Sequence, residues 1–239
     1  MTRAVGATLG DYATIADAVY GEEAELSTRA QGWTCQRRVA ATLSLGFQGA
    51  ILDNGREIIV AFKGTAPATR SVVADLQNDL VLFLNGLPNQ AAAADALVRQ
   101  AAQIARGKPI SLTGHSLGGA LCQVVGYWSG KPFVTFNAPP MLANLVQARL
   151  VAWTGATLAP LAALSGLVES ARTNTAVGGV GGQSINYMVR TDIISGVSIR
   201  PHYGRVVKLE NTVEGGGDHS MTTMLSLLRM RSLWNRTPW

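Results

Sequence analysis

Apolar side chains recur along much of the chain at the spacing of helices or strands. In residues 11–20 they follow a helical period, at Tyr12, Ile15, Ala16 and Val19. Residues 45–52 and 57–62 lie on either side of Asn54-Gly55, and the second of them contains the apolar run Ile-Ile-Val-Ala-Phe. An Asn-Gly pair favours a tight turn with positive φ angles, so this stretch predicts a β-hairpin.

The middle and the end of the chain predict helices and strands in alternation. An alanine-rich segment, residues 89–106, starts with a capping asparagine and is followed by Gly107, which predicts a helix. Strands are expected at residues 109–113, 132–136, 185–189 and 205–209, and further helices at 117–128 and 220–233. Strands that alternate with helices form a mostly parallel sheet covered on both faces. The sequence therefore predicts an α/β fold class.

One segment, residues 150–168, has no charged side chain over about the length that spans a bilayer. Two glycines and a proline interrupt it, which argues against a transmembrane helix. Two interpretations stay open: an insertion that packs into the core, or a lid or lipid-facing surface over an active site. We expect a single domain over residues 1–239, with an apolar insertion around residues 143–183.

Composition and charge narrow the class of protein. The chain has 239 residues, of which 47% are apolar and 15% charged, so it can bury a sizeable core. Its net charge of +5 is compatible with transient contact with an anionic membrane surface and equally with an ordinary soluble surface. No basic run interleaved with aromatic residues is present, so we expect no nucleic-acid partner. The oligomeric state has no signal in the sequence.

Cofactors and metals are not expected. Cys35 and Cys122 make no disulfide framework, and the histidines and cysteines lack the spacing of zinc ligands. The glycine-rich residues 178–182 lack the Lys-Ser/Thr of a phosphate-binding loop. The first residues lack the apolar run of a signal peptide, so we expect a cytoplasmic protein or one exported by a route that needs no leader.

The strongest signal is Gly114-His115-Ser116-Leu117-Gly118, which follows a predicted apolar strand and precedes a predicted apolar helix. A serine at a sharp strand-to-helix turn adopts a strained backbone conformation that requires small neighbours two residues away on each side. The turn lifts the hydroxyl off the sheet and places it at a helix N-terminus, where backbone N–H groups favour developing negative charge. The pattern predicts that Ser116 is a catalytic nucleophile.

At this motif the chain resembles the class 3 (fungal-type) lipases of the α/β-hydrolase superfamily. Further segments are similar to that family in the expected order: Phe62-Lys63-Gly64-Thr65, residues 75–80, Phe136-Asn137-Ala138-Pro139, residues 192–194, residues 201–204 and residues 218–220. The chain departs from the pattern at Lys63, where arginine is usual, and at Asn137, where glycine is common. A proline usual soon after Asp192 is also missing. The likeness covers most of the chain, except the first ten residues or so and residues 150–182.

The resemblance implies an α/β-hydrolase fold and a catalytic triad in the chain order Ser–Asp–His. A serine hydroxyl is a poor nucleophile and needs an adjacent base. We assign His219 as the base that takes the proton of Ser116 and returns it to the leaving alcohol. Asp192 is expected to hold the tautomer of that imidazole. Backbone N–H groups of Leu117 and Thr65 are expected to form the oxyanion hole, with the Thr65 hydroxyl as a third donor.

Other assignments stay open. His202 also follows Asp192 and is the main alternative base, whereas His115 lies inside the turn and is expected to point elsewhere. Asp218 is expected to be the N-cap of the last helix. Cys122 is expected to be a small buried side chain.

The resemblance predicts a lipase-type serine ester hydrolase that cleaves acyl esters of glycerolipids through a covalent acyl-enzyme. One alternative is a phospholipase A-type enzyme that acts on membranes, including the case of an exported antibacterial effector. An alternative from another class is a non-catalytic membrane- or partner-binding module on the same fold.

Overall fold

The computed structural model describes residues 6–40, 46–64, 72–142, 145, 183–196 and 201–239. Within these residues, seven strands form one sheet in chain order. They are β1 (Thr34–Val39), β2 (Gly49–Asp53), β3 (Ile58–Phe62), β4 (Ile110–His115), β5 (Phe133–Phe136), β6 (Ile185–Val189) and β7 (Arg205–Leu209). The pairs β1–β2 and β2–β3 are antiparallel, and every pair from β3 to β7 is parallel. The predicted mostly parallel sheet is confirmed.

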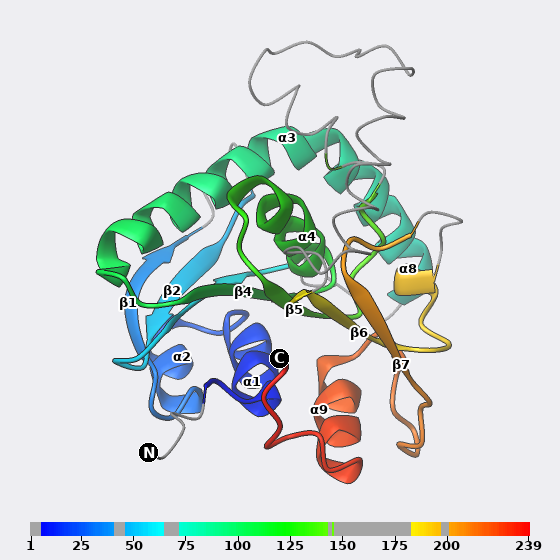
Figure 1. Ribbon diagram of the computed structural model, residues 1–239. Helices are drawn as coiled ribbons and strands as arrows, with labels where there is room; N and C mark the ends of the chain where they lie inside the picture. The colour runs from blue at the N-terminus through cyan, green and yellow to red at the C-terminus, as the bar shows by residue number, and fades with distance from the viewer. Residues whose placement is uncertain (1–5, 41–45, 65–71, 143–144, 146–182, 197–200) are drawn as a thin grey trace.

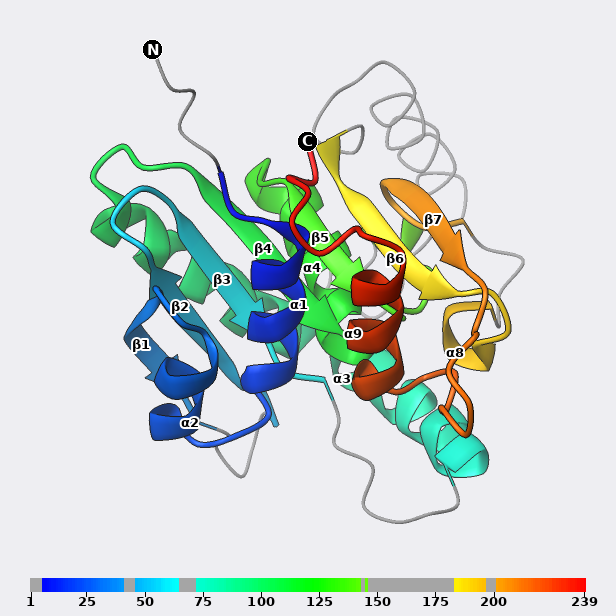
Figure 2. The same cartoon turned by 90° about the horizontal axis from the view of Figure 1, so that it is seen from below.

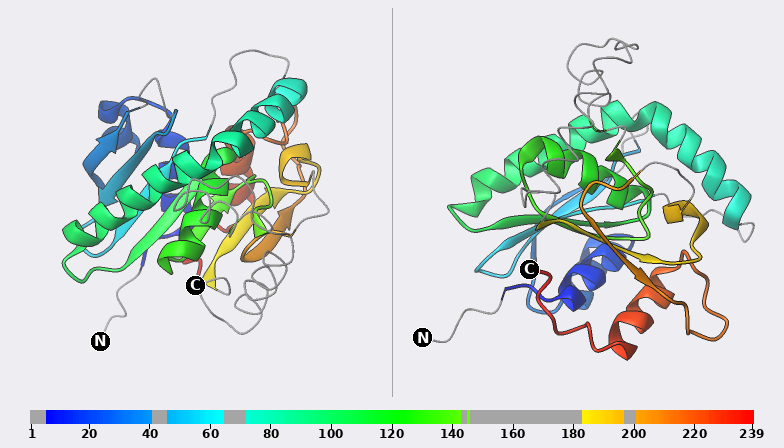
Figure 3. Two further views of the ribbon diagram at one scale, coloured as in Figure 1. Left: turned by 90° about the horizontal axis from the view of Figure 1, so that it is seen from above. Right: turned by 45° about the vertical axis from the view of Figure 1, so that its right-hand side comes forward.

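Helices cover both faces of this sheet (Figure 1). They are α1 (Leu9–Ala18), α2 (Glu23–Arg29), α3 (Val72–Ala105), α4 (Leu117–Ser129), α8 (Ile193–Gly196) and α9 (Met221–Met230). α3 and α4 lie on one face, and α3 crosses that face above α4 (Figure 3). α1 and α9 lie side by side on the other face, with α2 near the β1 edge (Figure 2). The predicted α/β class, with helices flanking a central sheet, is confirmed.

The core consists of two layers separated by the sheet, and β3 shows why. Ile58, Val60 and Phe62 belong to the cluster that packs against α3 and α4. Ile59 and Ala61 point to the opposite side and pack with the residues of α1 and α9. Because both faces of the strand are covered, its run of apolar residues is continuous rather than alternating.

The predicted hairpin is confirmed, but its turn is longer than expected. β2 ends at Asp53 and β3 begins at Ile58, and these two residues pair across the turn. Gly55 has a positive φ of 86°, whereas Asn54 is absent from the residues with positive φ. The Asn54 side-chain oxygen instead accepts hydrogen bonds from the backbone N–H groups of Arg56 and Glu57, both at 2.9 Å. Asparagine thus closes the turn through its side chain.

The predicted alanine-rich helix is confirmed, but its predicted start at residue 89 was wrong. α3 begins at Val72 and continues through Pro88 to Ala105. A proline inside a helix costs about 3 kcal/mol because it removes one hydrogen bond and crowds the preceding turn. On both sides of Pro88, α3 contributes side chains to the core that it shares with α4: Leu87, Ala91, Ala94, Leu97, Val98, Ala101 and Ala105. This packing offsets the cost, so the helix bends over the sheet instead of ending.

The other predicted strands and helices are found with bounds shifted by at most a few residues, and β6 and β7 match the prediction exactly in extent. The sequence analysis missed the edge strand β1 and the short helices α2 and α8. The apolar segment 150–168 and the glycine-rich residues 178–182 lie outside the described residues, so the insertion and the single-domain boundary stay predictions. Among the helices that the structure describes, none is long and apolar enough to cross a membrane.

Candidate active site

Ser116 stands at the junction of β4 and α4, at the carboxyl end of the parallel strands. Its backbone has φ 55° and ψ −127°, in the positive-φ region that residues with a side chain rarely adopt. The backbone N–H of Ser116 donates to the carbonyl of Phe136 at 3.0 Å, which ties the turn to the end of β5. The strained serine predicted from the motif is therefore present in the structure.

The two glycines of the motif are needed because the backbone passes very close to them. A Cβ atom added to Gly118 would lie 2.1 Å from the carbonyl oxygen of Phe62. A Cβ atom added to Gly114 would lie 2.5 Å from the carbonyl carbon of Gly118. These separations are far below van der Waals contact, so no other residue type fits at either position without moving the backbone.

The structure brings together the three residues that the sequence predicted as a triad. His219, just before α9, has its Nε2 atom 2.8 Å from Ser116 Oγ. Its Nδ1 atom is 2.9 Å from Asp192 Oδ1. The side chain of His219 is 14% exposed and that of Asp192 only 2%, so the imidazole separates the carboxylate from solvent.

Asp192 is held by the first turn of α8. Its Oδ1 accepts from the backbone N–H of Ile194 at 3.2 Å, and its Oδ2 accepts from the N–H of Ser195 at 3.2 Å. The Ser195 hydroxyl donates to the same Oδ2 at 2.6 Å. Three donors besides His219 therefore contact this buried carboxylate and fix its orientation. The sequence analysis predicted no role for Ser195.

His115 does not face the Ser116 hydroxyl. Its Nε2 lies 2.8 Å from the backbone carbonyl oxygen of His219, and its Nδ1 lies 3.3 Å from the Tyr20 hydroxyl. A carbonyl oxygen only accepts, so Nε2 carries the proton and Nδ1 accepts from Tyr20. Burial, with a smaller contribution from His219, lowers the pKa of His115 to about 3. The ring is therefore neutral, as this pair of hydrogen bonds requires.

Tyr20 links this histidine to the segment that leads to the predicted oxyanion residue. The Tyr20 hydroxyl accepts a hydrogen bond from the backbone N–H of Gly64 at 3.1 Å. Burial raises the pKa of Tyr20, so the hydroxyl keeps its proton and can donate to His115. Thr65 itself lies outside the described residues. Leu117, the other predicted oxyanion donor, is the first residue of α4, where backbone N–H groups lack a partner within the helix.

The alternative base and the predicted cap lie elsewhere. His202 Nε2 is 3.2 Å from the backbone carbonyl oxygen of Ser195, so the ring packs against the turn that holds Asp192. Asp218 is not the N-cap of α9: that position is Ser220, whose hydroxyl accepts from the N–H of Thr222 at 3.1 Å. Asp218 Oδ1 instead accepts from the side chain of Asn211 at 2.6 Å. The helix starts at Met221, so Ser220, two positions after Asp218, caps it.

Sequence reasoning also assigned no role to Asn137, which lies fully buried at the end of β5 with a positive φ of 46°. Its side chain contacts the segments that carry Asp192 and His219. Its place directly after a predicted buried strand is the only sequence signal for it, and other polar residues at strand ends share that signal. Cys122 is fully buried on α4, as predicted.

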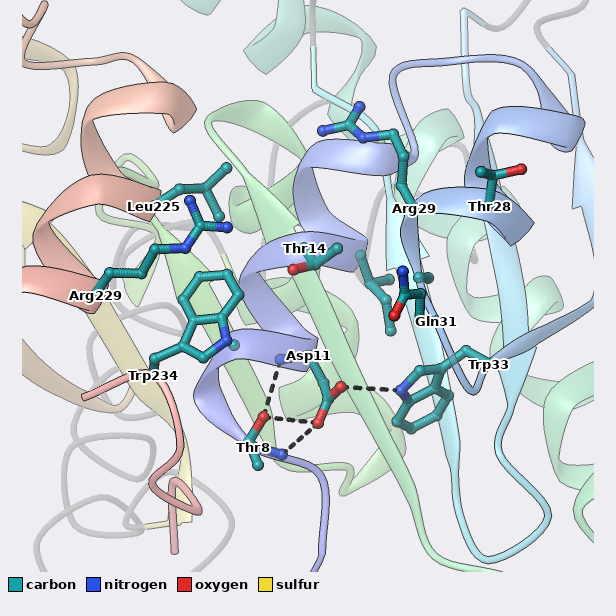
Figure 4. A pocket seen from close by; sticks show the side chains of 13 residues that line it. Thr8, Asp11, Thr14, Thr28, Arg29, Gln31, Trp33, Leu225, Arg229 and Trp234 are labelled. Atoms are coloured by element: carbon teal, nitrogen blue, oxygen red, sulfur yellow. Dashed lines mark hydrogen bonds between the residues drawn. The ribbon is translucent and has the colours of Figure 1, made fainter. Parts of the chain in front are cut away.

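Among the described residues, no group of three or more histidine, cysteine, aspartate or glutamate side chains is arranged to hold a metal ion. A pocket of about 470 Å³ lies between the first turns of α1, the end of α2 and the end of α9, lined by Asp11, Trp33, Arg229 and Trp234 among others (Figure 4). Tyr20, which contacts the site, follows the opposite end of α1. This pocket is therefore remote from Ser116.

Solved structures of fungal lipases are similar to the chain in fold. The lipase from Rhizopus microsporus var. chinensis is 16% identical at a TM-score of 0.50, and the match covers 79% of this chain and 67% of the lipase. Lipase II from Rhizopus niveus is 16% identical at a TM-score of 0.46, over 78% of this chain and 72% of the lipase. Rhizomucor miehei lipase in its propeptide complex is 16% identical at a TM-score of 0.44, over 79% and 62%.

The chain thus spans about two thirds of the length of these lipases. The first of them, with the highest TM-score of the three, supports the α/β-hydrolase type of fold. No curated protein matches the chain.

A family model described as a phospholipase-like, Tle-like phospholipase domain matches residues 11–212. This range includes Ser116 and Asp192 and ends shortly before His219. The match extends over most of the chain. The chain therefore belongs to the phospholipase-like family, as a Tle-like phospholipase domain with a fungal-lipase type of fold, and its enzyme class is that of the lipid ester hydrolases.

Proposed function

We propose that the chain hydrolyses acyl esters of glycerophospholipids through a covalent acyl-enzyme on Ser116. The observation that carries this proposal is the position of one imidazole. His219 makes a contact of 2.8 Å with the Ser116 hydroxyl on one side and of 2.9 Å with the Asp192 carboxylate on the other. This is the arrangement that turns an unreactive hydroxyl into a nucleophile.

The proposed reaction has two halves. Ser116 Oγ attacks the ester carbonyl carbon while His219 Nε2 takes the hydroxyl proton, and the carbonyl oxygen becomes an oxyanion. When the carbon–oxygen bond to the glycerol side breaks, His219 donates the proton to the leaving alkoxide and the acyl group stays on Ser116. Water then attacks the acyl-enzyme with His219 again as base, and this step releases the fatty acid and restores the serine.

Asp192 and the helix end have supporting roles in this proposal. The Asp192 carboxylate accepts from Nδ1–H of His219, which leaves Nε2 free to accept the serine proton and stabilises the imidazolium that follows. The backbone N–H of Leu117 lies at the start of α4, next to Ser116, and in this proposal it donates to the oxyanion. Thr65, which lies outside the described residues, is the second donor that the proposal assigns. Each such donor typically contributes about 10²–10³ to turnover.

The lipid class is taken from the family. The match to a phospholipase-like domain supports a phospholipid rather than a neutral lipid as substrate. The net charge of +5 is compatible with this choice, because phospholipid surfaces are often anionic. The triad geometry supports acyl transfer in general and does not select between these lipids.

The role of Ser116 is tested by Ser116→Ala on a soluble p-nitrophenyl ester. We expect kcat to fall on the order of 10⁶-fold, because no other hydroxyl is bonded to His219 among the described residues. Ser226→Ala is the matched control, since that serine lies on α9 and its hydroxyl contacts only its own helix. Full activity of Ser116→Ala would overturn the mechanism and favour a non-catalytic binding module.

The choice of base is tested by comparing two histidines. His219→Ala should lose activity about as fully as Ser116→Ala. His202→Ala should keep most of its activity, since the His202 ring contacts the Ser195 carbonyl and not Ser116.

The lipid class is tested by mass spectrometry of products from a mixed emulsion of phospholipid and triacylglycerol. Lysophospholipid and fatty acid are expected, and diacylglycerol as the main glycerol product would refute the phospholipid assignment.

A further inference from the structure

Asn137 combines an unusual backbone conformation with complete burial. It follows β5 directly, its φ of 46° lies in the left-handed region, and its side chain is 0% exposed. A buried amide has a donor and an acceptor that both need partners. The structure supplies both: Asn137 Nδ2 donates to the backbone carbonyl of Asp218 at 3.0 Å, and Asn137 Oδ1 accepts from the backbone N–H of Val189 at 2.9 Å.

These two partners belong to the two segments that carry the acid and the base. Asp218 immediately precedes His219. Val189 is the last residue of β6, and its carbonyl accepts from the backbone N–H of Asp192 at 3.1 Å. A single side chain therefore connects the backbone next to His219 with the turn that leads to Asp192.

His219 lies in a glycine-rich loop, so its position depends on contacts with the rest of the fold. Residues 214–219 read Glu-Gly-Gly-Gly-Asp-His, and glycine leaves a backbone with many accessible conformations. The His115 ring provides a second hold on this loop through the carbonyl of His219 at 2.8 Å. The turn before α9 is thus bonded to the end of β4, the strand that precedes Ser116, and to the end of its neighbour β5.

Only an amide satisfies both contacts of Asn137. Glycine fits the positive φ without strain but has neither donor nor acceptor. An ionised aspartate keeps the acceptor for Val189 and has no proton for the Asp218 carbonyl. Loss of the base-side bond would let the glycine-rich loop move His219 relative to Ser116 and Asp192, and a misplacement of about 1 Å can cost roughly 10²-fold in rate.

We propose that Asn137 is a positioning residue that sets the geometry of the base relative to the acid. It does so by bonding the backbone of Asp218 and of Val189 at once. This proposal rests on the function proposed above, in which His219 and Asp192 act on Ser116.

The test measures kcat and KM on a soluble ester together with thermal unfolding. Asn137→Gly should lower kcat roughly ten- to a hundredfold while KM changes little, because soluble substrate binding does not involve the buried amide. The matched control is Asn186→Ala. Asn186 is equally buried on β6, and its side chain accepts from Thr135 and donates to the Tyr203 carbonyl, away from the triad segments. This control should lower the unfolding midpoint and keep kcat near that of the unaltered enzyme at temperatures where it is folded.

A second variant keeps the proposal testable if Asn137→Gly does not fold. Asn137→Asp barely changes the side-chain volume. Its kcat relative to the unaltered enzyme should recover at lower pH, where a protonated carboxyl again donates to the Asp218 carbonyl.

An unchanged kcat in the folded Asn137 variant would overturn the proposal, as would an equal loss of kcat in Asn186→Ala. Ser116→Ala is assayed in parallel: if it stays active, the proposed function fails, whereas an inactive Ser116→Ala beside a fully active Asn137 variant refutes the positioning role alone.

Discussion

At the scale of single residues, the site depends on hydrogen bonds that cross the molecule. Tyr20 follows α1, yet its hydroxyl bonds to Gly64 after β3 and to His115 at the end of β4. His115 in turn bonds to the backbone of His219. One chain of hydrogen bonds therefore joins the segment before the predicted oxyanion residue to the loop that carries His219. The neutral His115 is essential to it, because an imidazolium could not accept from Tyr20.

Tyr20→Phe should lower kcat on a soluble ester by roughly tenfold, since it leaves the N–H of Gly64 and Nδ1 of His115 without their partner at a cost of about 1–3 kcal/mol. Tyr12→Phe is the matched control. Its hydroxyl is also buried on the α1 side, but it bonds to Ser111 Oγ at 2.7 Å, inside the core. Equal kcat values for the two variants would contradict a role of Tyr20 in the site.

At the scale of elements, two sets of interactions stabilise the start of α1. Thr8 and Asp11 form a capping box, which satisfies the first backbone N–H groups from within the segment. The C-terminal tail adds tertiary contacts: the N–H of Leu9 donates to the carbonyl of Arg236 at 2.7 Å, and that of Gly10 to the carbonyl of Trp234 at 2.8 Å. The indole of Trp234 lies directly against Gly10, so the two ends of the chain are packed together.

Gly10→Ala should destabilise the protein by about 1–3 kcal/mol, because the new Cβ atom would lie 2.5 Å from Trp234 Cε2. The measurement is the free energy of unfolding in urea. Gly6→Ala is the control, since the atom of the described residues nearest to its new Cβ atom would be Glu57 Oε1, at 3.9 Å. An unchanged stability of Gly10→Ala would show that the indole moves away freely.

At the scale of the whole molecule, the neutral His115 couples stability to pH. The folded protein lowers the pKa of His115 from 6.5 to about 3, mainly by burial. Between these two values the unfolded chain binds a proton that the folded protein does not. This contribution to stability is therefore fully present above pH 6.5 and is lost as the pH falls towards 3. Burial lowers the pKa of His202 as well, which acts in the same direction.

We expect His115→Gln to weaken this pH dependence. The unfolding free energy should fall more steeply with decreasing pH in the unaltered protein than in the variant. The difference in slope should approach about 1.4 kcal/mol per pH unit below pH 6.5, which corresponds to one proton. Urea unfolding over a pH series measures it. Parallel plots for the two proteins would mean that His115 takes up a proton in the folded state.

The features that the sequence determined by itself are local. A serine flanked two residues away by glycines specifies the strained turn at Ser116, because sterics between near neighbours decide its backbone angles. Likewise, the apolar run at residues 58–62 indicated a strand, which the structure shows to be buried on both faces. The Ser–Asp–His order and the assignment of Asp192 and His219 came from resemblance to a family, and the structure places His219 within hydrogen-bond distance of both Ser116 and Asp192.

Only the tertiary structure decided which residues distant in sequence contact each other. His219 and Ser116 are 103 positions apart, and Asn137 and Asp218 are 81 apart. Neither the role of Asn137 nor the choice of His219 over His202 follows from local pattern, since any polar residue on a strand-end loop would look alike. The helix through Pro88 has the same origin: local preference opposes it, and packing of its apolar face against α4 and the sheet prevails.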